Sequence, residues 1–179
     1  MSKVTAAVYV GLDGVVEEPR WTTPFWSDDL ARAQRDLLFA SDALLLGRVT
    51  YEGFAQAWPS MTDEEGFADR MNGMPKLVAT RTRTDLEWNA TPLRDDAVDA
   101  VRELKAQGDT RYLVYGSATL LNALTPHGLV DEYRLMTFPV VVGKGRRLFD
   151  EGVTATLRLV DSWTTSTGVA MLSYAPVAD

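Results

Sequence analysis

One stretch of the chain runs from a strand into a helix through a Gly-Ser turn. Residues 112–115 have the apolar character of a short buried strand, Gly116 and Ser117 form the turn, and residues 118–124 place apolar side chains on one helical face. Such a turn leaves the first N–H groups of the helix free to bind an anion, most often a phosphate. Ser117 or Thr119 can either cap the helix or bond to a phosphate oxygen. The stretch predicts an α/β fold and is compatible with a structural turn or with a phosphate site.

Two further strand ends carry similar chemistry. Residues 42–46 form an apolar run without alternation, typical of a strand that is covered on both faces, and the strand predicted at 76–80 is followed by hydroxyl and guanidinium groups. Open α/β sheets bind ligands at the carboxyl ends of their strands. Any one polar residue at these strand ends could be a surface arginine or a helix cap. Together, the residues at the two strand ends and at the Gly-Ser turn favour an extended ligand with several phosphates, such as a dinucleotide. The residues at these two strand ends are Gly47, Arg48, Thr50, Thr80, Arg81, Thr82 and Arg83.

Composition narrows the classes of function. The chain has 179 residues, 46% of them hydrophobic, and a net charge of −7, which argues against a general nucleic-acid binder. It has no cysteine and one histidine, so a Cys-ligated metal, a thiolate nucleophile, a histidine metal cluster and a Ser-His-Asp triad are not expected. No segment is typical of a signal peptide or of a membrane span, and we expect a cytoplasmic protein without a membrane partner.

The order of the elements indicates one domain over residues 1–179. We expect an α/β fold with three layers, α/β/α, around a mixed and mostly parallel central sheet that ends in a C-terminal antiparallel hairpin. The loop after the first strand is expected over 11–24, and a Thr62–Glu65 capping box is expected to open a short helix. Strands are predicted at 4–10, 43–46, 76–80, 86–88, 112–115, 130–142 with a break at Pro139, 154–163 and 169–175. Helices are predicted at 28–40, 48–57, 62–73, 95–107 and 118–124.

Several motifs together resemble one superfamily. They are GLDG at 11–14, GRVTYEGF at 47–54, YGSATL at 115–120, GLVDE at 128–132 and PVVVGKGRRLF at 139–149. In this order, and over essentially the whole chain, they resemble the dihydrofolate reductase-like superfamily, in the branch of the riboflavin-biosynthesis reductase domain. The resemblance implies NADPH as cofactor, hydride transfer like that of 5-amino-6-(5-phosphoribosylamino)uracil reductase, and a homodimer. The cofactor residues it implies are Gly47, Arg48, Thr50, Thr80, Arg81, Thr82, Gly116, Ser117, Ala118, Thr119 and Leu120.

The chain departs from this pattern at two places. Family members often carry Gly-Gly where this chain has Gly116 and Ser117. Folate-reducing members have Trp-x-x-Pro-x-acid, and here Trp21 and Pro24 keep the spacing but Trp26 stands where the acid should be. A folate-type substrate would lose its anchor, so negligible dihydrofolate reductase activity is expected.

The remaining chemistry requires few side chains, because the cofactor supplies the hydride. Asp13, Glu17, Asp28 or a water could donate a proton, and the sequence does not choose among them. The substrate pocket is predicted from aromatic residues that could equally be core: Trp21, Tyr51, Phe54 and Phe138. The favoured function is an NADPH-dependent reductase of a small pyrimidine- or pterin-like molecule; the alternatives are a dinucleotide-binding protein without turnover and an authentic dihydrofolate reductase.

Overall fold

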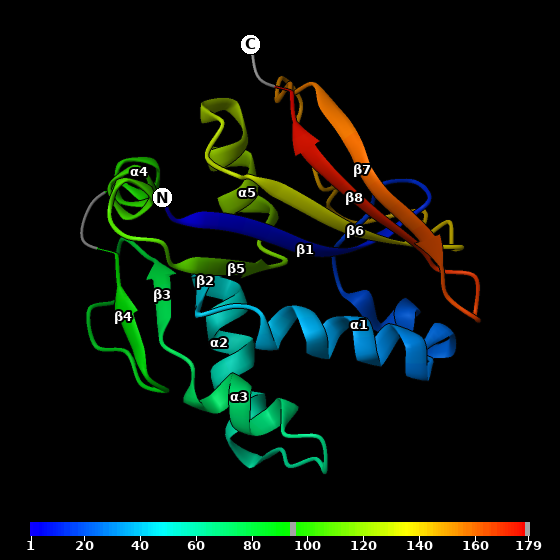
Figure 1. The fold of residues 1–179 in the computed structure, drawn as a ribbon, viewed down its shortest axis with the longest axis horizontal. Coiled ribbons are helices and arrows are strands. Elements are labelled where there is room, and N and C mark those ends of the chain that lie inside the picture. The colour runs from blue at the N-terminus through cyan, green and yellow to red at the C-terminus, as the bar shows by residue number, and fades with distance from the viewer. Residues whose placement is uncertain (94–95, 178–179) are drawn as a thin grey trace.

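A computed structural model describes residues 1–93 and 96–177. It contains an eight-stranded sheet in the order β4-β3-β2-β5-β1-β6-β8-β7 (Figure 1). The strands are β1 (Lys3–Gly11), β2 (Ala43–Gly47), β3 (Lys76–Ala79), β4 (Ala90–Pro92), β5 (Arg111–Tyr115), β6 (Glu132–Phe138), β7 (Leu157–Thr164) and β8 (Ala170–Pro176). The helices are α1 (Asp28–Phe39), α2 (Arg48–Ala57), α3 (Phe67–Gly73), α4 (Ala97–Ala106) and α5 (Ala118–Leu124), with 3₁₀ turns at Pro19–Phe25, Trp58–Ser60 and Thr125–His127.

Helices cover both faces of the sheet, and Figure 1 shows α1, α2 and α3 on one side of it and α4 and α5 on the other. All five residues of β2 are buried, because successive side chains point to opposite faces of the sheet and helices cover both faces. Ala43 and Leu45 pack in the core formed with α4 and α5, whereas Leu44 and Leu46 pack in the core formed with α1, α2 and α3. The predicted three-layer α/β/α architecture is confirmed.

The strand directions place several strand ends at one edge. Six strands run parallel to one another, so their carboxyl ends lie on the same side of the sheet: β4, β3, β2, β5, β1 and β6. β8 runs antiparallel to β6, and β7 runs antiparallel to β8. The mostly parallel sheet and the C-terminal antiparallel pair are therefore as the sequence predicts.

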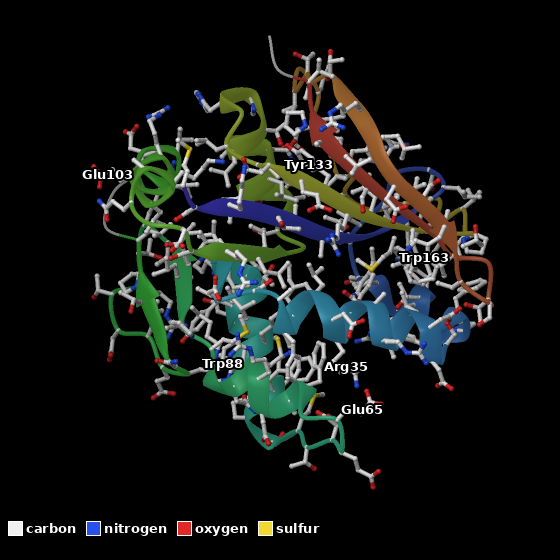
Figure 2. The ribbon with its side chains drawn as sticks, viewed as in Figure 1. Arg35, Glu65, Trp88, Glu103, Tyr133 and Trp163 are labelled. Atoms are coloured by element: carbon white, nitrogen blue, oxygen red, sulfur yellow. The ribbon has the colours of Figure 1, made fainter. Side chains whose placement is uncertain are left out.

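The outermost strand leaves apolar side chains in solvent. In β7, Leu159 is 52% exposed, Val160 is 53% exposed and Trp163 is 40% exposed. Figure 2 shows Trp163 at the β7–β8 pair. An edge strand with such side chains is a surface at which a second chain could pack.

Two predicted elements are displaced. The strand expected at 86–88 is replaced by β4 at Ala90–Pro92, because Trp88 and Asn89 have φ values of 59° and 53° and form a turn. The helix expected to open at a Thr62–Glu65 capping box begins instead at Phe67, after Gly66 with a φ of 78°. The Asp63 carboxylate accepts from the backbone N–H groups of Phe67 and Ala68 in its first turn.

Other boundaries shift by smaller amounts. The loop expected over 11–24 ends in the 3₁₀ turn Pro19–Phe25, which extends one residue beyond it. The strand expected over 130–142 breaks at Pro139 as predicted, because proline lacks a backbone donor; β6 spans Glu132–Phe138 and does not resume at 140–142. The helix expected from Asp95 begins at Ala97 with Asp96 as its cap, and Asp95 itself lies outside the described residues.

Candidate functional site

The carboxyl ends of the parallel strands open onto a cleft of about 1590 Å³. Residues from the ends of β1, β2, β3 and β5 line it, together with the first turns of α2 and α5. All eleven residues that the sequence suggests for the cofactor lie along this one cleft: Gly47, Arg48, Thr50, Thr80, Arg81, Thr82, Gly116, Ser117, Ala118, Thr119 and Leu120. The fold thus brings together three segments that are up to about seventy residues apart in the sequence, a separation that no local pattern spans.

The turns after β2 and β5 touch each other. A Cβ atom on Gly47 would lie 2.0 Å from the Ser117 Oγ, so any other residue there would force Ser117 to move. Gly116 and Ser117 both have positive φ values, of 55° and 52°, and a Cβ on Gly116 would meet no atom within 4 Å. Neither α2 nor α5 has a side-chain cap at its N-terminus. Ser117 therefore does not act as a helix cap, and the open space at Gly116 lets a ligand approach the backbone.

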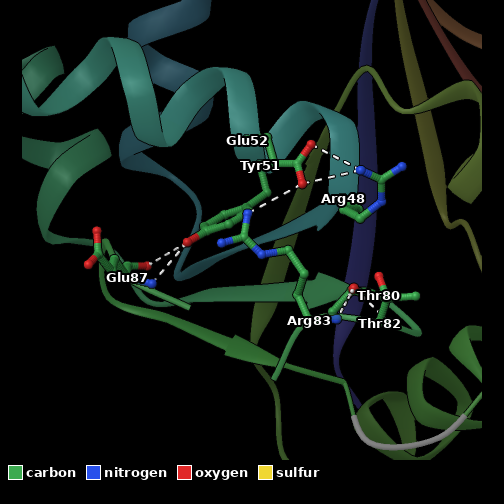
Figure 3. A network of polar contacts seen from close by, with 7 residues as sticks. All are labelled: Arg48, Tyr51, Glu52, Thr80, Thr82, Arg83 and Glu87. Atoms are coloured by element: carbon green, nitrogen blue, oxygen red, sulfur yellow. Dashed lines mark hydrogen bonds and ion pairs between the residues drawn. The ribbon is translucent and has the colours of Figure 1, made fainter. Parts of the chain in front are cut away.

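Polar contacts join the arginine residues of α2 and of the loop after β3 (Figure 3). Glu52 accepts from the Arg48 guanidinium at 3.0 Å and from the Arg83 guanidinium at 3.4 Å. The hydrogen bond from Arg48 is the main cause that lowers the pKa of Glu52. The Thr80 hydroxyl oxygen accepts from the backbone N–H groups of Thr82, at 3.4 Å, and Arg83, at 3.2 Å. Two cationic groups are thus held at the cleft by the chain's own carboxylate.

Aromatic side chains form a second part of the cleft, on the side of α1, α2 and α3. Phe54 packs edge-to-face on Trp58 and on Tyr115, with ring centroids 6.4 Å and 6.2 Å apart, and Trp58 packs on Phe67 at 5.4 Å. Seven residues on this side of the cleft are together called the aromatic wall: Tyr9, Gln34, Phe54, Trp58, Phe67, Met71 and Tyr115. Hydrophobic and aromatic lining of this kind is usual where a small molecule binds.

Two phenols of this wall are neutral over a wide pH range. Burial raises the pKa of Tyr9 to about 12, although the side chain of Gln34 donates a hydrogen bond to its hydroxyl. Burial also raises the pKa of Tyr115. The ring of Tyr115 lines the cleft, but its hydroxyl oxygen is buried and has no hydrogen-bond partner in the described part of the chain. Such an unsatisfied group is costly in a folded protein.

Only one of the four predicted substrate-pocket aromatics lines the cleft. Phe54 does, whereas Phe138 is fully buried beneath Tyr9 and Trp21, with ring centroids 5.7 Å from each. Tyr51 is 3% exposed, and its hydroxyl donates to the Glu87 carbonyl and accepts from the Glu87 N–H (Figure 3). Trp21 packs against Phe138 and also lies outside the cleft lining. Phe138 and Tyr51 are thus placed in the core rather than at a ligand surface.

Sequence reasoning missed the other aromatics of the wall, Tyr9, Trp58, Phe67 and Tyr115. Tyr9 and Tyr115 stand at the carboxyl ends of β1 and β5, which is the signal that could have identified them. Trp58 and Phe67 follow α2 and begin α3, and only the tertiary packing of these segments brings them to the cleft.

The predicted proton donors Asp13 and Asp28 do not line the cleft. The Asp13 carboxylate accepts from the Gly143 N–H at 2.8 Å, a bond that lowers its pKa and joins two loops. Asp28 is the first residue of α1. Glu17 does line the cleft, and its carboxylate accepts from the Arg146 N–H at 3.1 Å. Among the described residues, no three acidic or histidine side chains are grouped as a metal site would require.

The family follows from comparison with known proteins. The family model for the RibD C-terminal domain matches residues 2–171. The chain belongs to this family. It is 30% identical to the uncharacterized protein YyaP of Bacillus subtilis (strain 168) over 169 residues, which are 92% of this chain and 90% of YyaP.

Solved structures agree on a dihydrofolate reductase-like fold. A Shewanella sp. PV-4 protein assigned to riboflavin biosynthesis superimposes with a TM-score of 0.80 at 18% identity, covering 98% of this chain and 99% of that one. The Thermotoga maritima diaminohydroxyphosphoribosylaminopyrimidine deaminase/5-amino-6-(5-phosphoribosylamino)uracil reductase superimposes with a TM-score of 0.70 at 17% identity, covering 98% of this chain and 57% of that one. The resemblance noted in the sequence is confirmed. In the two ranges that the structure describes, no helix has the length and apolar character of a membrane span.

Proposed function

We propose that this RibD C-terminal domain protein is an NADPH-dependent reductase that transfers a hydride to a small heterocycle. The observation that carries the proposal is the meeting of three strand ends, with their glycine, hydroxyl and guanidinium groups, along one cleft. The cleft is large enough for an extended dinucleotide and a small second molecule. The Thermotoga maritima relative of the same fold is named as a reductase, which supports this class of reaction.

The residues present fit NADPH. Uncapped N–H groups and open backbone at Gly116 and Ser117 would hold the pyrophosphate. The guanidinium groups of Arg48, Arg81 and Arg83 would hold the phosphate on the adenosine ribose, the group that distinguishes NADPH from NADH. When bound, the cofactor supplies the hydride.

The chain's own residues would shape and dry the reaction site. The aromatic wall would orient a planar substrate and exclude water from it. Glu17 is the predicted proton donor that the cleft can reach directly, and a water is the alternative. Asp13 and Asp28 lie outside the cleft lining and are not proposed for this role.

A turnover assay tests the proposal. Purified protein is mixed with NADPH and a panel of pyrimidines and pteridines, and the loss of reduced-nicotinamide absorbance is followed. We expect oxidation above the substrate-free rate with at least one pyrimidine or pteridine. Tight NADPH binding with no oxidation across the panel would favour the alternative, a dinucleotide-binding protein without turnover.

The exposed edge of β7 supports a proposal about the assembly of the protein. We infer a cytoplasmic homodimer in which the exposed apolar side chains of β7 are covered by a second copy. A two-fold symmetric contact would cover this edge in both chains at once.

A further inference from the structure

Charge is distributed unevenly along the cleft. Its described lining contains four cationic side chains, those of Arg48, Arg81, Arg83 and Arg146. The first three belong to the start of α2 and to the loop after β3, and the fourth donates to the Thr119 hydroxyl at the start of α5. Arg48, Arg81 and Arg83 therefore lie with the segments proposed to hold the cofactor phosphates, whereas Arg146 joins the start of α5 to Glu17, whose carboxylate accepts from the Arg146 backbone N–H.

The part of the cleft that is lined by α1, by the C-terminal half of α2 with Trp58, and by α3 contains no charged side chain. The seven residues of the aromatic wall are five aromatics, one methionine and one glutamine. Along α2, Phe54 follows Arg48 by six residues, which separates their backbones by about 9 Å. A phosphate seated against this wall would find no charge-assisted partner, and transferring an anion to apolar surroundings is costly.

The polar groups of the wall are neutral and suited to a neutral ring. Gln34 and Tyr9 are hydrogen-bonded to each other across α1 and β1. The Tyr115 hydroxyl is buried without a partner and lies on a side chain that lines the cleft. A carbonyl or ring nitrogen of a bound molecule would give this hydroxyl an acceptor after a small shift of the side chain. The edge-to-face contacts of Phe54 leave aromatic surface for a planar ring to pack on.

We propose that the aromatic wall takes an uncharged planar heterocycle without a phosphate, and that the Tyr115 hydroxyl donates a hydrogen bond to it. The proposal rests on the proposed reductase function and narrows its substrate class. It sets this chain apart from the Thermotoga maritima relative, whose named substrate, 5-amino-6-(5-phosphoribosylamino)uracil, carries a phosphate.

A matched pair of ligands tests the absence of a phosphate site. Protein saturated with NADP⁺ is titrated calorimetrically with 5-amino-6-(5-phosphoribosylamino)uracil, with its dephosphorylated form, and with a set of uncharged pyrimidines and pteridines. A built phosphate site would strengthen binding about ten- to a hundredfold. We expect a phosphate to strengthen binding by no more than about threefold. A larger preference for the phosphorylated ligand, or no binding by any uncharged ring, overturns the proposal.

A matched pair of variants tests the role of Tyr115. Tyr115→Phe removes only the hydroxyl, and Tyr112→Phe does the same on the same strand but in the core on the α4 and α5 side. We expect Tyr115→Phe to weaken binding of the uncharged ligand about three- to tenfold with no fall in melting temperature, and Tyr112→Phe to leave this binding unchanged. Equal ligand affinity in wild type and Tyr115→Phe would contradict the assignment.

The cofactor titration separates the two proposals. NADPH binding by wild type and by Tyr115→Phe is measured first, without a second ligand. Unchanged NADPH affinity with a failed ligand result removes only the substrate inference, whereas absence of NADPH binding in the wild type removes the proposed function itself.

Discussion

The contact between the turns after β2 and β5 gives a prediction whose size follows from the structure. Gly47→Ala would place a Cβ 2.0 Å from the Ser117 Oγ and 3.0 Å from the Ser117 Cβ. Rotation of the serine hydroxyl would relieve the first clash but not the second. The φ of Gly47 is −74°, so alanine carries no backbone penalty there and gains about 0.4–1 kcal/mol from a more restricted unfolded chain. Overpacking costs about 1–3 kcal/mol, and the middle of the two ranges gives a net loss of about 1.3 kcal/mol.

Urea unfolding of wild type and variants measures this loss. Gly53→Ala is the matched control, because a Cβ there meets no atom within 4 Å and alanine should raise the free energy of unfolding by about 0.5–1 kcal/mol. Gly47→Ala combined with Ser117→Gly should recover the loss, since glycine removes both clashing atoms and relieves the positive φ of Ser117. Wild-type stability in Gly47→Ala, or no recovery in the double variant, would refute the close approach of the two turns.

Four further outcomes are expected. Lys76 is fully buried and burial lowers its pKa to about 8, so at pH 7 the folded state bears the cost of a charged amine, offset in part by its hydrogen bond to the Asn72 carbonyl at 2.9 Å and its contact with the Trp88 ring; Lys76→Met should raise the free energy of unfolding at pH 7 by on the order of 1 kcal/mol. Between pH 8 and 10.5, the pKa of this lysine in the unfolded chain, only the unfolded chain keeps the proton, so the free energy of unfolding of the wild type rises with pH. The difference in the free energy of unfolding between Lys76→Met and the wild type should therefore shrink. A constant difference in urea unfolding from pH 7 to 10 would contradict this. Arg48→Ala should weaken NADPH binding about tenfold or more with little change in melting temperature, whereas Arg102→Ala, on the exposed face of α4, should change neither; loss of stability with unchanged NADPH affinity would make Arg48 structural. Light scattering at micromolar concentration should give twice the chain mass of 19.8 kDa, and Leu159→Lys on β7 should shift it to one chain; a single-chain mass for the wild type would exclude the homodimer. Dihydrofolate should not be turned over, because Trp26 stands where a folate reductase has its acid, and robust turnover would show that this alignment is wrong.

Local patterns predicted the elements that are buried on both sides or clearly amphipathic. The uniform apolar run at 43–46 forms part of β2, and α2 begins at Arg48 and ends at Ala57 as expected. Burial of a strand and the periodicity of a helix both produce patterns among residues close in sequence, so they can be predicted locally. The strand expected at 86–88 failed for a local reason too: Asn89 is of a type that adopts positive φ more readily than most, but the positive φ of Trp88 is not evident from a residue type that normally avoids it.

The cofactor side of the cleft was easier to foresee than the substrate side. Strand order places Gly47, Thr80 and Gly116 at one edge, so a rule about sheet topology was enough. Which aromatic side chains face the cleft depends on how α2 and α3 pack, and the sequence could not separate core Phe138 from cleft-lining Phe54. The contact between Gly47 and Ser117 likewise arises only from tertiary structure.

Equilibrium titration of the wild-type protein with NADPH and with NADH, followed by intrinsic tryptophan fluorescence and checked by calorimetry, tests the central claim most directly. We expect one NADPH per chain and an affinity for NADPH at least about tenfold higher than for NADH, because the cleft offers Arg48, Arg81 and Arg83 to the additional phosphate. Equal affinity for the two nucleotides would contradict the role of these arginines. Binding of neither would contradict the assignment of the cleft to a nicotinamide cofactor.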